Sequence, residues 1–455
     1  MSTAVADRPA QRRIPPGPPG RFLLGNLPDF ARDVLAFHER CRDQYGDVVR
    51  LKLGSRIVYV LNHPDLIHEV LVANHHNFVK HSFFWRHVTA IFGKGLLTNE
   101  GDSWLRQRRL MAPAFHRDRI TAYGQTMVAY TQRMLTGWRA GDVRNVHHDM
   151  MHLTLEIVGK VLFDADVGAD AEAIGNAFDA VTDEIAARFR RPVFIPDWVP
   201  LPGNVRYRHG VATLDKLVYR VIAEHRANGA RGGDLLSMLM QARDEDGTQM
   251  SDRQLRDEAI TLLLAGHETT ALALSWTWYL LSRHPEVDAR LGAELQRVLN
   301  GRPPAPADLP SLRYTEQVIM ESMRLFPPAY GIGREAVHDC AVGGYHVPAG
   351  TTLFMSPWLM HRDARWFDEP QRFTPERWGD GLADRLPRHV YMPFGGGPRI
   401  CIGNSFAMLE AVLLLATIAQ RFRLEPASAA PVVPFPTITL RPSGGVAIRV
   451  AERSA

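Results

Sequence analysis

The sequence predicts a mainly α-helical protein with small β-sheets, and three observations support this prediction. Apolar residues recur every three or four positions along most of the chain, which is the spacing of helices with one buried face. Short runs rich in β-branched residues stand apart from these segments and are too few for a large sheet. No pattern repeats with a period of about 20 to 50 residues, so a solenoid of stacked repeats is excluded.

The first elements after a Pro/Gly segment are two strands, at residues 48–53 and 56–61, which Gly54 and Ser55 join as a hairpin. Beyond them helices dominate, and the spacing predicts them at residues 121–138, 148–162, 171–189, 210–227, 252–282, 287–299, 315–325 and 405–421. Short strands are expected at residues 341–347, 351–355 and 437–440. A proline-rich connection at residues 191–203 is either an ordinary surface loop or a mobile lid over an apolar pocket.

The composition describes an ordinary globular protein. The chain has 455 residues, of which 45% are hydrophobic and 22% charged, so disorder and collagen-like structure are excluded. Residues 1–14 are expected to form a flexible tail, and the segment IPPGPPG leads into a single folded domain at residues 15–455. The net charge of +4 is spread without a basic block, so we expect no nucleic-acid partner.

The cysteines and the N-terminus indicate the compartment. The three cysteines, Cys41, Cys340 and Cys401, are too few and too scattered for a disulfide framework, which points to the cytoplasm. The first residues contain no apolar stretch, so neither a secretory signal nor a membrane anchor is expected there. Residues 259–281 form an apolar stretch that is long enough to cross a bilayer. Glu268 near their centre would cost about 3 kcal/mol in a membrane, however, so we expect a buried central helix.

This acid within an apolar helix has two interpretations. Glu268 is either a core acid paired with an arginine or a capping amide elsewhere, or a functional group that handles protons. Thr269 can donate a hydrogen bond to the carbonyl of Ala265 four residues back, which tends to bend a helix, and Gly266 lacks a side chain. Together these residues would open a small polar groove.

A glycine-rich loop carries Cys401. Residues 393–403 read PFGGGPRICIG, and glycines let a backbone turn tightly and approach a flat ligand closely. Cys401 stands at the start of a strong helix, where free amides and the helix dipole favour a thiolate, as a metal ligand requires. The alternative is a buried structural cysteine. Zinc is disfavoured because no second cysteine or histidine lies at ligand spacing.

In their order along the chain, these motifs resemble those of the cytochrome P-450 superfamily of haem-thiolate monooxygenases. The family's haem loop is matched by Phe394, Gly397, Arg399, Cys401 and Gly403. Its central-helix motif AGxETT is matched by Ala265, Gly266, Glu268, Thr269 and Thr270. Its Glu-x-x-Arg helix is matched by Glu321 and Arg324, and Arg377 of the segment PERW matches the third member of that set. The resemblance covers about residues 15–442, and although each motif alone is weak, the ordered set is specific.

The resemblance implies a cytochrome P-450 fold, with a long central helix over haem b (iron protoporphyrin IX). It implies that Cys401 ligates the iron and that the cofactor-binding residues are Trp104, Arg108, Arg334, Phe394, Arg399, Cys401 and Gly403. Glu268 and Thr269 would be the catalytic pair that passes protons and holds dioxygen. Glu321, Arg324 and Arg377 would form a buried ion network that supports the fold.

The resemblance also implies a lipophilic substrate, either a fatty acid or a terpenoid or steroid-like compound. The pocket would be lined by Phe83, Phe84, Ala265, Tyr330, Ile332 and Ile438. A fatty acid would need a cation at the pocket mouth, and the candidates are Lys80, Arg86, Arg188 and Arg190.

The expected enzyme is a bacterial, cytoplasmic monomer that inserts one oxygen atom of O2 into its substrate. Electrons would come from NAD(P)H through a separate ferredoxin or flavodoxin-type partner with its reductase, because the chain ends at Ala455 without room for a flavin domain. Basic residues including Arg106 and Arg109 could steer an acidic redox partner. The alternatives are a peroxide-driven peroxygenase and a haem protein that binds ligands without turnover, against which the intact acid and alcohol pair argues.

Overall fold

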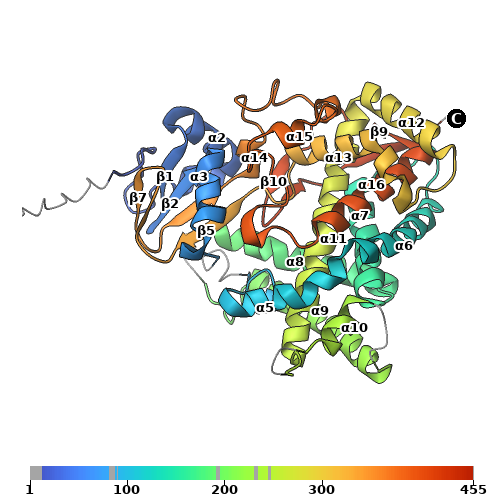
Figure 1. Ribbon diagram of the computed structural model, residues 1–455, viewed down its shortest axis with the longest axis horizontal. Helices are drawn as coiled ribbons and strands as arrows, with labels where there is room; N and C mark the ends of the chain where they lie inside the picture. Colours follow the sequence, from blue (N-terminus) through green and yellow to red (C-terminus); the bar gives the residue numbers. More distant parts are fainter. Residues whose placement is uncertain are drawn as a thin grey trace, which may run out of the picture.

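A long helix, α11 (Asp252–Arg283), runs through the middle of the molecule (Figure 1). It packs against α7 (Val146–Phe163), α9 (Pro202–Ala227), α13 (Arg313–Leu325) and α16 (Asn404–Arg421). Being surrounded, it buries most of its side chains, as expected for a core helix. The Ser251 hydroxyl caps its start by accepting a hydrogen bond from the Gln254 amide at 3.3 Å, and Pro285 follows its end.

The computed structural model describes residues 13–80, 88–89, 91–190, 195–229, 234–243 and 247–453. The remaining helices of this part are α1 (Leu27–Arg32), α2 (Val34–Tyr45), α3 (Pro64–His68), α5 (Gly101–Met111), α6 (Arg117–Leu135), α8 (Ala171–Arg190), α10 (Leu235–Gln241), α12 (Pro285–Leu299), α14 (Pro357–Met360) and α15 (Leu382–Arg385). Among the described helices, none has the combination of length and hydrophobicity that a membrane crossing requires.

The strands form small separate sheets. The largest has the order β1-β2-β8-β5-β3, built from β1 (Val48–Leu53), β2 (Arg56–Leu61), β8 (Thr352–Met355), β5 (Ile332–Ala336) and β3 (Phe78–Val79). The other sheets pair β4 (Val143–Asn145) and β9 (Phe422–Pro426) with β12 (Ala447–Glu452), β6 (Cys340–Val342) with β7 (Tyr345–Val347), and β10 (Pro434–Pro436) with β11 (Leu440–Pro442). The prediction of a mainly helical protein with small sheets is confirmed.

Most of the predicted elements are present, and two strand predictions are wrong. The hairpin of β1 and β2 has the predicted bounds, with Val49 opposite Val60. Residues 341–347 form two short strands, because Gly343 and Gly344 take positive φ angles and turn the chain back on itself. Residues 437–439 form a turn, in which the Thr437 amide donates to the Thr439 carbonyl at 2.8 Å, and only Leu440 begins a strand.

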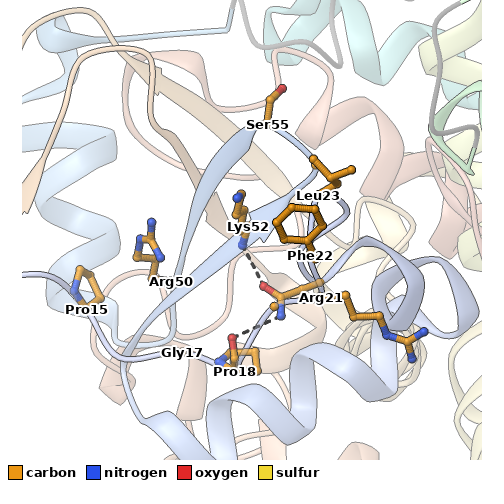
Figure 2. Close-up of a pocket in the computed structure, with 12 residues that line it drawn as sticks. Pro15, Gly17, Pro18, Arg21, Phe22, Leu23, Arg50, Lys52 and Ser55 are labelled. Atoms are coloured by element: carbon orange, nitrogen blue, oxygen red, sulfur yellow. Dashed lines mark hydrogen bonds between the residues drawn. The ribbon is translucent and has the colours of Figure 1, made fainter.

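The Pro/Gly segment at the start of the described chain lies against β1. The Arg50 amide donates to the Pro16 carbonyl at 2.7 Å, and a Cβ on Gly17 would lie 1.9 Å from the Arg50 carbonyl oxygen. The Asn26 side chain donates to the carbonyls of Pro18 and Pro19 and accepts from the Lys52 amide at 2.9 Å. The bonds to Pro18 and Lys52 are drawn in Figure 2. The hollow beside this segment, of about 640 Å³, is lined by residues of the segment and the first hairpin and by no predicted site residue.

Candidate functional site

The loop that carries Cys401 is shaped by its glycines. The Cys401 amide donates to the Phe394 carbonyl at 3.0 Å, which closes the loop. Gly397 has a φ of 67°, and a Cβ there would lie 2.0 Å from the Leu71 carbonyl oxygen, so no other residue fits. The Cys401 side chain remains exposed, which allows its sulfur to reach a ligand.

The electrostatics of the Cys401 thiol are mixed. Although the side chain keeps an exposed surface, the protein packed around the sulfur reduces its hydration, which raises the pKa of the thiol. A backbone hydrogen bond at Gly403 and the charges of Arg108 and Lys80 lower that pKa. Burial thus opposes the thiolate that the Gly403 hydrogen bond and the neighbouring cations favour. A coordinated metal ion would deprotonate such a thiol.

Four cations converge close to this loop, and the described residues supply a single carboxylate among them. Burial lowers the pKa of Arg334 to about 10, with repulsion from Arg399 adding to the effect. Burial also lowers the pKa of Lys80 well below its usual value, and Arg334, Arg399 and Arg108 repel it further. Glu100 is the carboxylate, and it forms an ion pair with Arg399. The positive charge of the cluster is thus only partly neutralised by Glu100.

This excess of positive charge fits the two propionates of a haem. Carboxylates taken out of water need cationic or hydrogen-bonding partners, and arginine binds them with charge-assisted hydrogen bonds. The guanidinium carbon of Arg399 lies 4.2 Å from the centre of the Trp104 ring, and the guanidinium carbon of Arg108 lies 6.0 Å from the same centre. The described residues therefore fit a haem with its iron at Cys401. Sequence reasoning considered Lys80 only as a substrate anchor and missed Glu100.

On α11, the acid and the alcohol have different surroundings. The Thr269 hydroxyl donates to the Ala265 carbonyl at 2.8 Å, as predicted, and Ala265 is exposed although most of the helix is buried. Glu268 is buried, and its Oε1 accepts hydrogen bonds from Thr439 Oγ1 at 2.9 Å and Arg441 Nε at 2.8 Å. The arginine partner that sequence analysis left open is thus present. Gly266 lies against Val158 of α7 and permits close helix packing there.

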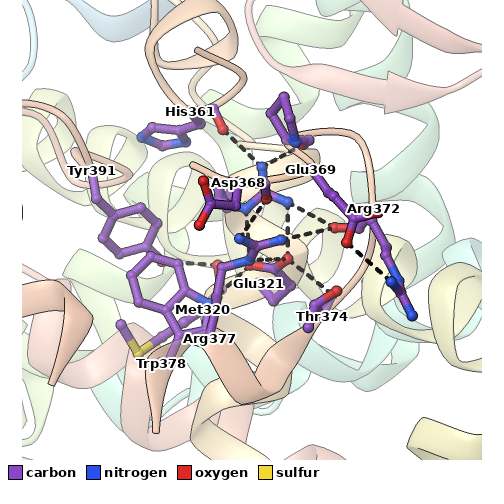
Figure 3. Close-up of polar contacts among 12 residues, drawn as sticks. Met320, Glu321, His361, Asp368, Glu369, Arg372, Thr374, Arg377, Trp378 and Tyr391 are labelled. Carbon is purple, nitrogen blue, oxygen red and sulfur yellow. Dashed lines mark hydrogen bonds and ion pairs between the residues drawn. The ribbon is translucent and has the colours of Figure 1, made fainter. Parts of the chain in front are cut away.

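Glu321, Arg324 and Arg377 lie in one buried network. Arg324 donates to both oxygens of Glu321 at 2.9 Å, and Arg377 Nε donates to Oε1 of the same carboxylate at 2.9 Å. Trp378 Nε1 and the Thr374 amide complete the carboxylate's shell at 2.9 and 3.0 Å (Figure 3). The network joins α13 to the segment before α15.

A protein-family model described as cytochrome P450 matches residues 15–448, nearly the whole chain. The chain belongs to the cytochrome P450 family.

Curated relatives agree with this assignment. The cytochrome P450 is 38% identical over 442 residues to cyclooctatin synthase of Streptomyces melanosporofaciens, with 96% of each chain covered. It is 37% identical over 429 residues to cyclooctat-9-en-7-ol 5-monooxygenase of the same organism, covering 93% of this chain and 92% of that one. It is 35% identical over 414 residues to pentalenene oxygenase of Streptomyces avermitilis, covering 90% of this chain and 91% of that one. The chain is therefore a monooxygenase of a family that uses haem.

Two of the predicted pocket residues of this cytochrome P450, Tyr330 and Ile438, meet at one turn, and a third, Ile332, lies at the Cys401 loop. The Tyr330 hydroxyl donates to the Thr437 carbonyl at 2.9 Å, in the turn that contains Ile438. Ile332 lies beside the Cys401 loop, since a Cβ on Gly395 would be 3.7 Å from its Cδ1. Phe83 and Phe84 lie outside the described residues.

Glu410 on α16 is a candidate that sequence reasoning missed. It is fully buried, and within the described part of the cytochrome P450 neither carboxyl oxygen has a hydrogen-bond partner. Burial raises its pKa to about 8, opposed by the hydroxyl of Thr270, the last residue of the α11 motif. The acid is therefore protonated near neutral pH. A single acid within the apolar run of residues 406–419 was the available signal.

The buried Glu410 should make stability depend on pH. The folded protein keeps this proton up to about pH 8, whereas the unfolded chain loses it near its ordinary pKa of 4.5, so raising the pH through this window destabilises the folded state. We expect the melting temperature of Glu410→Gln to fall less than that of the parent between about pH 6 and about pH 8. Glu452→Gln, at an exposed position of β12, should keep the parent's slope. Equal slopes for the parent and Glu410→Gln would contradict the assignment.

Proposed function

We propose that this cytochrome P450 hydroxylates an uncharged terpenoid, with haem b held by Cys401 and the cation cluster of Lys80, Arg108, Arg334 and Arg399. The observation that carries the cofactor part is the excess of cations over carboxylates in that cluster. Trp104, Phe394 and Gly403 would contact the haem from α5 and from the Cys401 loop. Bound through a thiolate, haem supplies the activation of O2 and the insertion of one oxygen atom into the substrate.

Glu268 and Thr269 would deliver the protons that the reaction consumes. Hydroxylation uses one O2, two electrons and two protons, and yields the alcohol and one water. The Thr269 hydroxyl donates its hydrogen bond to the Ala265 carbonyl, so the lone pairs of its oxygen remain available to accept a hydrogen bond. Glu268 contributes a carboxylate that can take up and release protons within the buried helix. Ala265, Tyr330, Ile332 and Ile438 would contact the substrate, together with Phe83 and Phe84.

The choice of a terpenoid over a fatty acid rests on the surroundings of the candidate anchors. Arg188 is buried and already paired with Glu184 at 3.3 Å and Asp197 at 2.9 Å, so its charge is neutralised. Lys80 belongs to the cation cluster, and the other two candidates, Arg86 and the side chain of Arg190, lie outside the described residues. A carboxylate brought into an apolar pocket without a partner is strongly disfavoured, whereas a terpenoid needs only shape and apolar contact. The names of the relatives, pentalenene oxygenase and cyclooctat-9-en-7-ol 5-monooxygenase, support the same class.

The remaining parts of the proposal concern partners and assembly. Electrons would come from NAD(P)H through a separate ferredoxin or flavodoxin-type protein and its reductase. Arg109 is exposed on α5 and could attract an acidic partner, whereas Arg399 is engaged by Glu100. The protein would work as a monomer in the bacterial cytoplasm, as one haem domain at residues 15–455. Residues 1–12 of the tail expected at 1–14 lie outside the described residues.

Ligand-induced changes in the haem absorption spectrum test the substrate class. We expect pentalenene or cyclooctat-9-en-7-ol to shift the spectrum of the haem-loaded protein, and palmitate to bind at least about tenfold more weakly, a difference of about 1.4 kcal/mol. Added salt should leave the terpenoid affinity unchanged, because no charge pair is involved. Tight palmitate binding that weakens with salt would contradict the proposal and favour a carboxylate anchor.

A further inference from the structure

Arg441 on β11 links two helices that belong to different parts of the fold. Its Nε donates to Glu268 of α11 at 2.8 Å, and its Nη1 donates to Asp179 of α8 at 3.0 Å. The guanidinium carbon also lies 5.4 Å from the ring centre of Phe178, the residue before Asp179. One side chain therefore contacts the buried acid and the helix that crosses near it.

The contacts of Glu268 all converge on one of its two oxygens. Oε1 receives Thr439 Oγ1 and Arg441 Nε, and Arg441 Nη2 lies 2.7 Å from the same atom without a hydrogen-bonding angle. Within the described residues, Oε2 makes no hydrogen bond. An arginine that binds one carboxylate oxygen fixes the carboxylate in place and leaves its second oxygen available to exchange protons.

The other end of the link lies nearer to solvent. The Asp179 side chain is 58% exposed, whereas those of Arg441 and Glu268 are 11% and 5% exposed. Next to it, the Phe178 ring packs edge-on against the His267 ring of α11, with centres 5.1 Å apart (Figure 1 shows the two helices). Any shift of α8 away from α11 would break the Asp179 contact and disturb the surroundings of Arg441.

We propose that Arg441 is a positioning residue for Glu268, and that Asp179 ties this anchor to helix α8. The acid then keeps its position only while the Asp179 contact holds α8 against Arg441, so the placement of α8 and the readiness of Glu268 to deliver protons are coupled. The inference rests on the proposed role of Glu268 as a proton carrier. Its test distinguishes a failure of that role from a failure of the positioning role of Arg441.

Hydrogen exchange of the haem-loaded protein tests the tie to α8. In Arg441→Gln and Asp179→Asn, we expect the amides of α8 to exchange about two- to fivefold faster than in the parent, because a partly exposed ion pair is lost. Glu172→Gln is the control, since Glu172 is an exposed acid on the same helix α8 and forms no ion pair within the described residues. Unchanged exchange in Asp179→Asn would overturn the tie.

Oxidation of NADPH without substrate tests the positioning role. With surrogate ferredoxin and reductase, NADPH, a proton and O2 yield NADP⁺ and hydrogen peroxide, and the rate depends on proton delivery. We expect Glu268→Gln to slow this reaction at least about tenfold and to enlarge its solvent deuterium isotope effect. Arg441→Gln should do the same, and the double variant should match Glu268→Gln alone, because both changes act on one group. Arg441→Lys replaces Arg441→Gln should the latter fail to fold.

The outcomes separate the two claims. A normal rate in Glu268→Gln would contradict the proposed function, whatever happens at α8. A slow Glu268→Gln with a normal Arg441→Gln, or losses that simply add in the double variant, would overturn the positioning role and leave the proposed function intact.

Discussion

Replacing Cys401 with alanine is expected to abolish the thiolate-type carbon monoxide difference band of the reduced protein, and with it all monooxygenation. The glycine loop presents the Cys401 sulfur at its exposed end, and no other described cysteine belongs to this loop. A thiolate ligand donates electron density that favours cleavage of the O–O bond, and neither water nor a histidine supplies it to the same degree. Turnover should therefore fall to the background of the assay.

The matched control for this change is Cys340→Ala. Cys340 is a free, partly exposed cysteine on β6, in a hairpin separate from the Cys401 loop. Its replacement should leave the band and the activity of the parent unchanged. A thiolate-type band of full intensity in Cys401→Ala would show that another residue ligates the iron.

Replacing Arg324 with alanine is expected to prevent accumulation of folded protein. The Arg324 side chain is 0% exposed, and besides Glu321 it donates to the carbonyls of His361 at 2.8 Å, Pro370 at 2.6 Å and Arg372 at 3.0 Å. Its removal takes two hydrogen bonds and one of two cations from the buried Glu321 carboxylate and leaves three carbonyls without this donor, at a cost of about 3 to 5 kcal/mol. A typical domain is stable by only about 5 to 15 kcal/mol, so much of the margin is lost.

Two further variants sharpen this prediction. Arg324→Lys should rescue little, because an ammonium group cannot reproduce the paired hydrogen bonds and the reach to three carbonyls. Arg372→Ala removes an exposed side chain paired with Glu369 but keeps the backbone carbonyl, so stability should change by less than about 0.5 kcal/mol. Melting curves of haem-loaded protein measure both. An Arg324→Ala protein that melts within about 2 °C of the parent would contradict a supporting role for the network.

The elements that sequence could predict are those with a strong period or a decisive turn. Helix α11 and the β1–β2 hairpin are evident because burial on all sides and alternation leave clear patterns. Helix α5 was missed since its sequence GDSWLRQRRLM is mostly charged and polar, so its apolar stripe is thin. The strand expected at 437–440 was misplaced because the Thr437 side chain stabilises a turn, which a run of threonine and isoleucine does not reveal.

The candidate site was predictable where its residues are close in sequence and hidden where they are far apart. Cys401 stands out within its own loop, and Glu268 stands out within an apolar helix. Arg441 is 173 residues from Glu268, and Glu100 is 299 residues from Arg399, so no spacing connects either pair. Charge partners of this kind are set by tertiary packing. The family resemblance named Arg108, Arg334 and Arg399, but only the structure adds Lys80 and Glu100 to them.

The most direct test of the account is the fate of molecular oxygen. The haem-loaded protein, with surrogate ferredoxin, reductase and NADPH, is supplied with ¹⁸O2 and with whichever of pentalenene or cyclooctat-9-en-7-ol shifts its spectrum, and the product is analysed by mass spectrometry. We expect one ¹⁸O atom in each molecule of product, and none when the label is in water. Product without the label, or peroxide-driven product with no dependence on the reductase, would contradict a reductase-driven terpenoid monooxygenase.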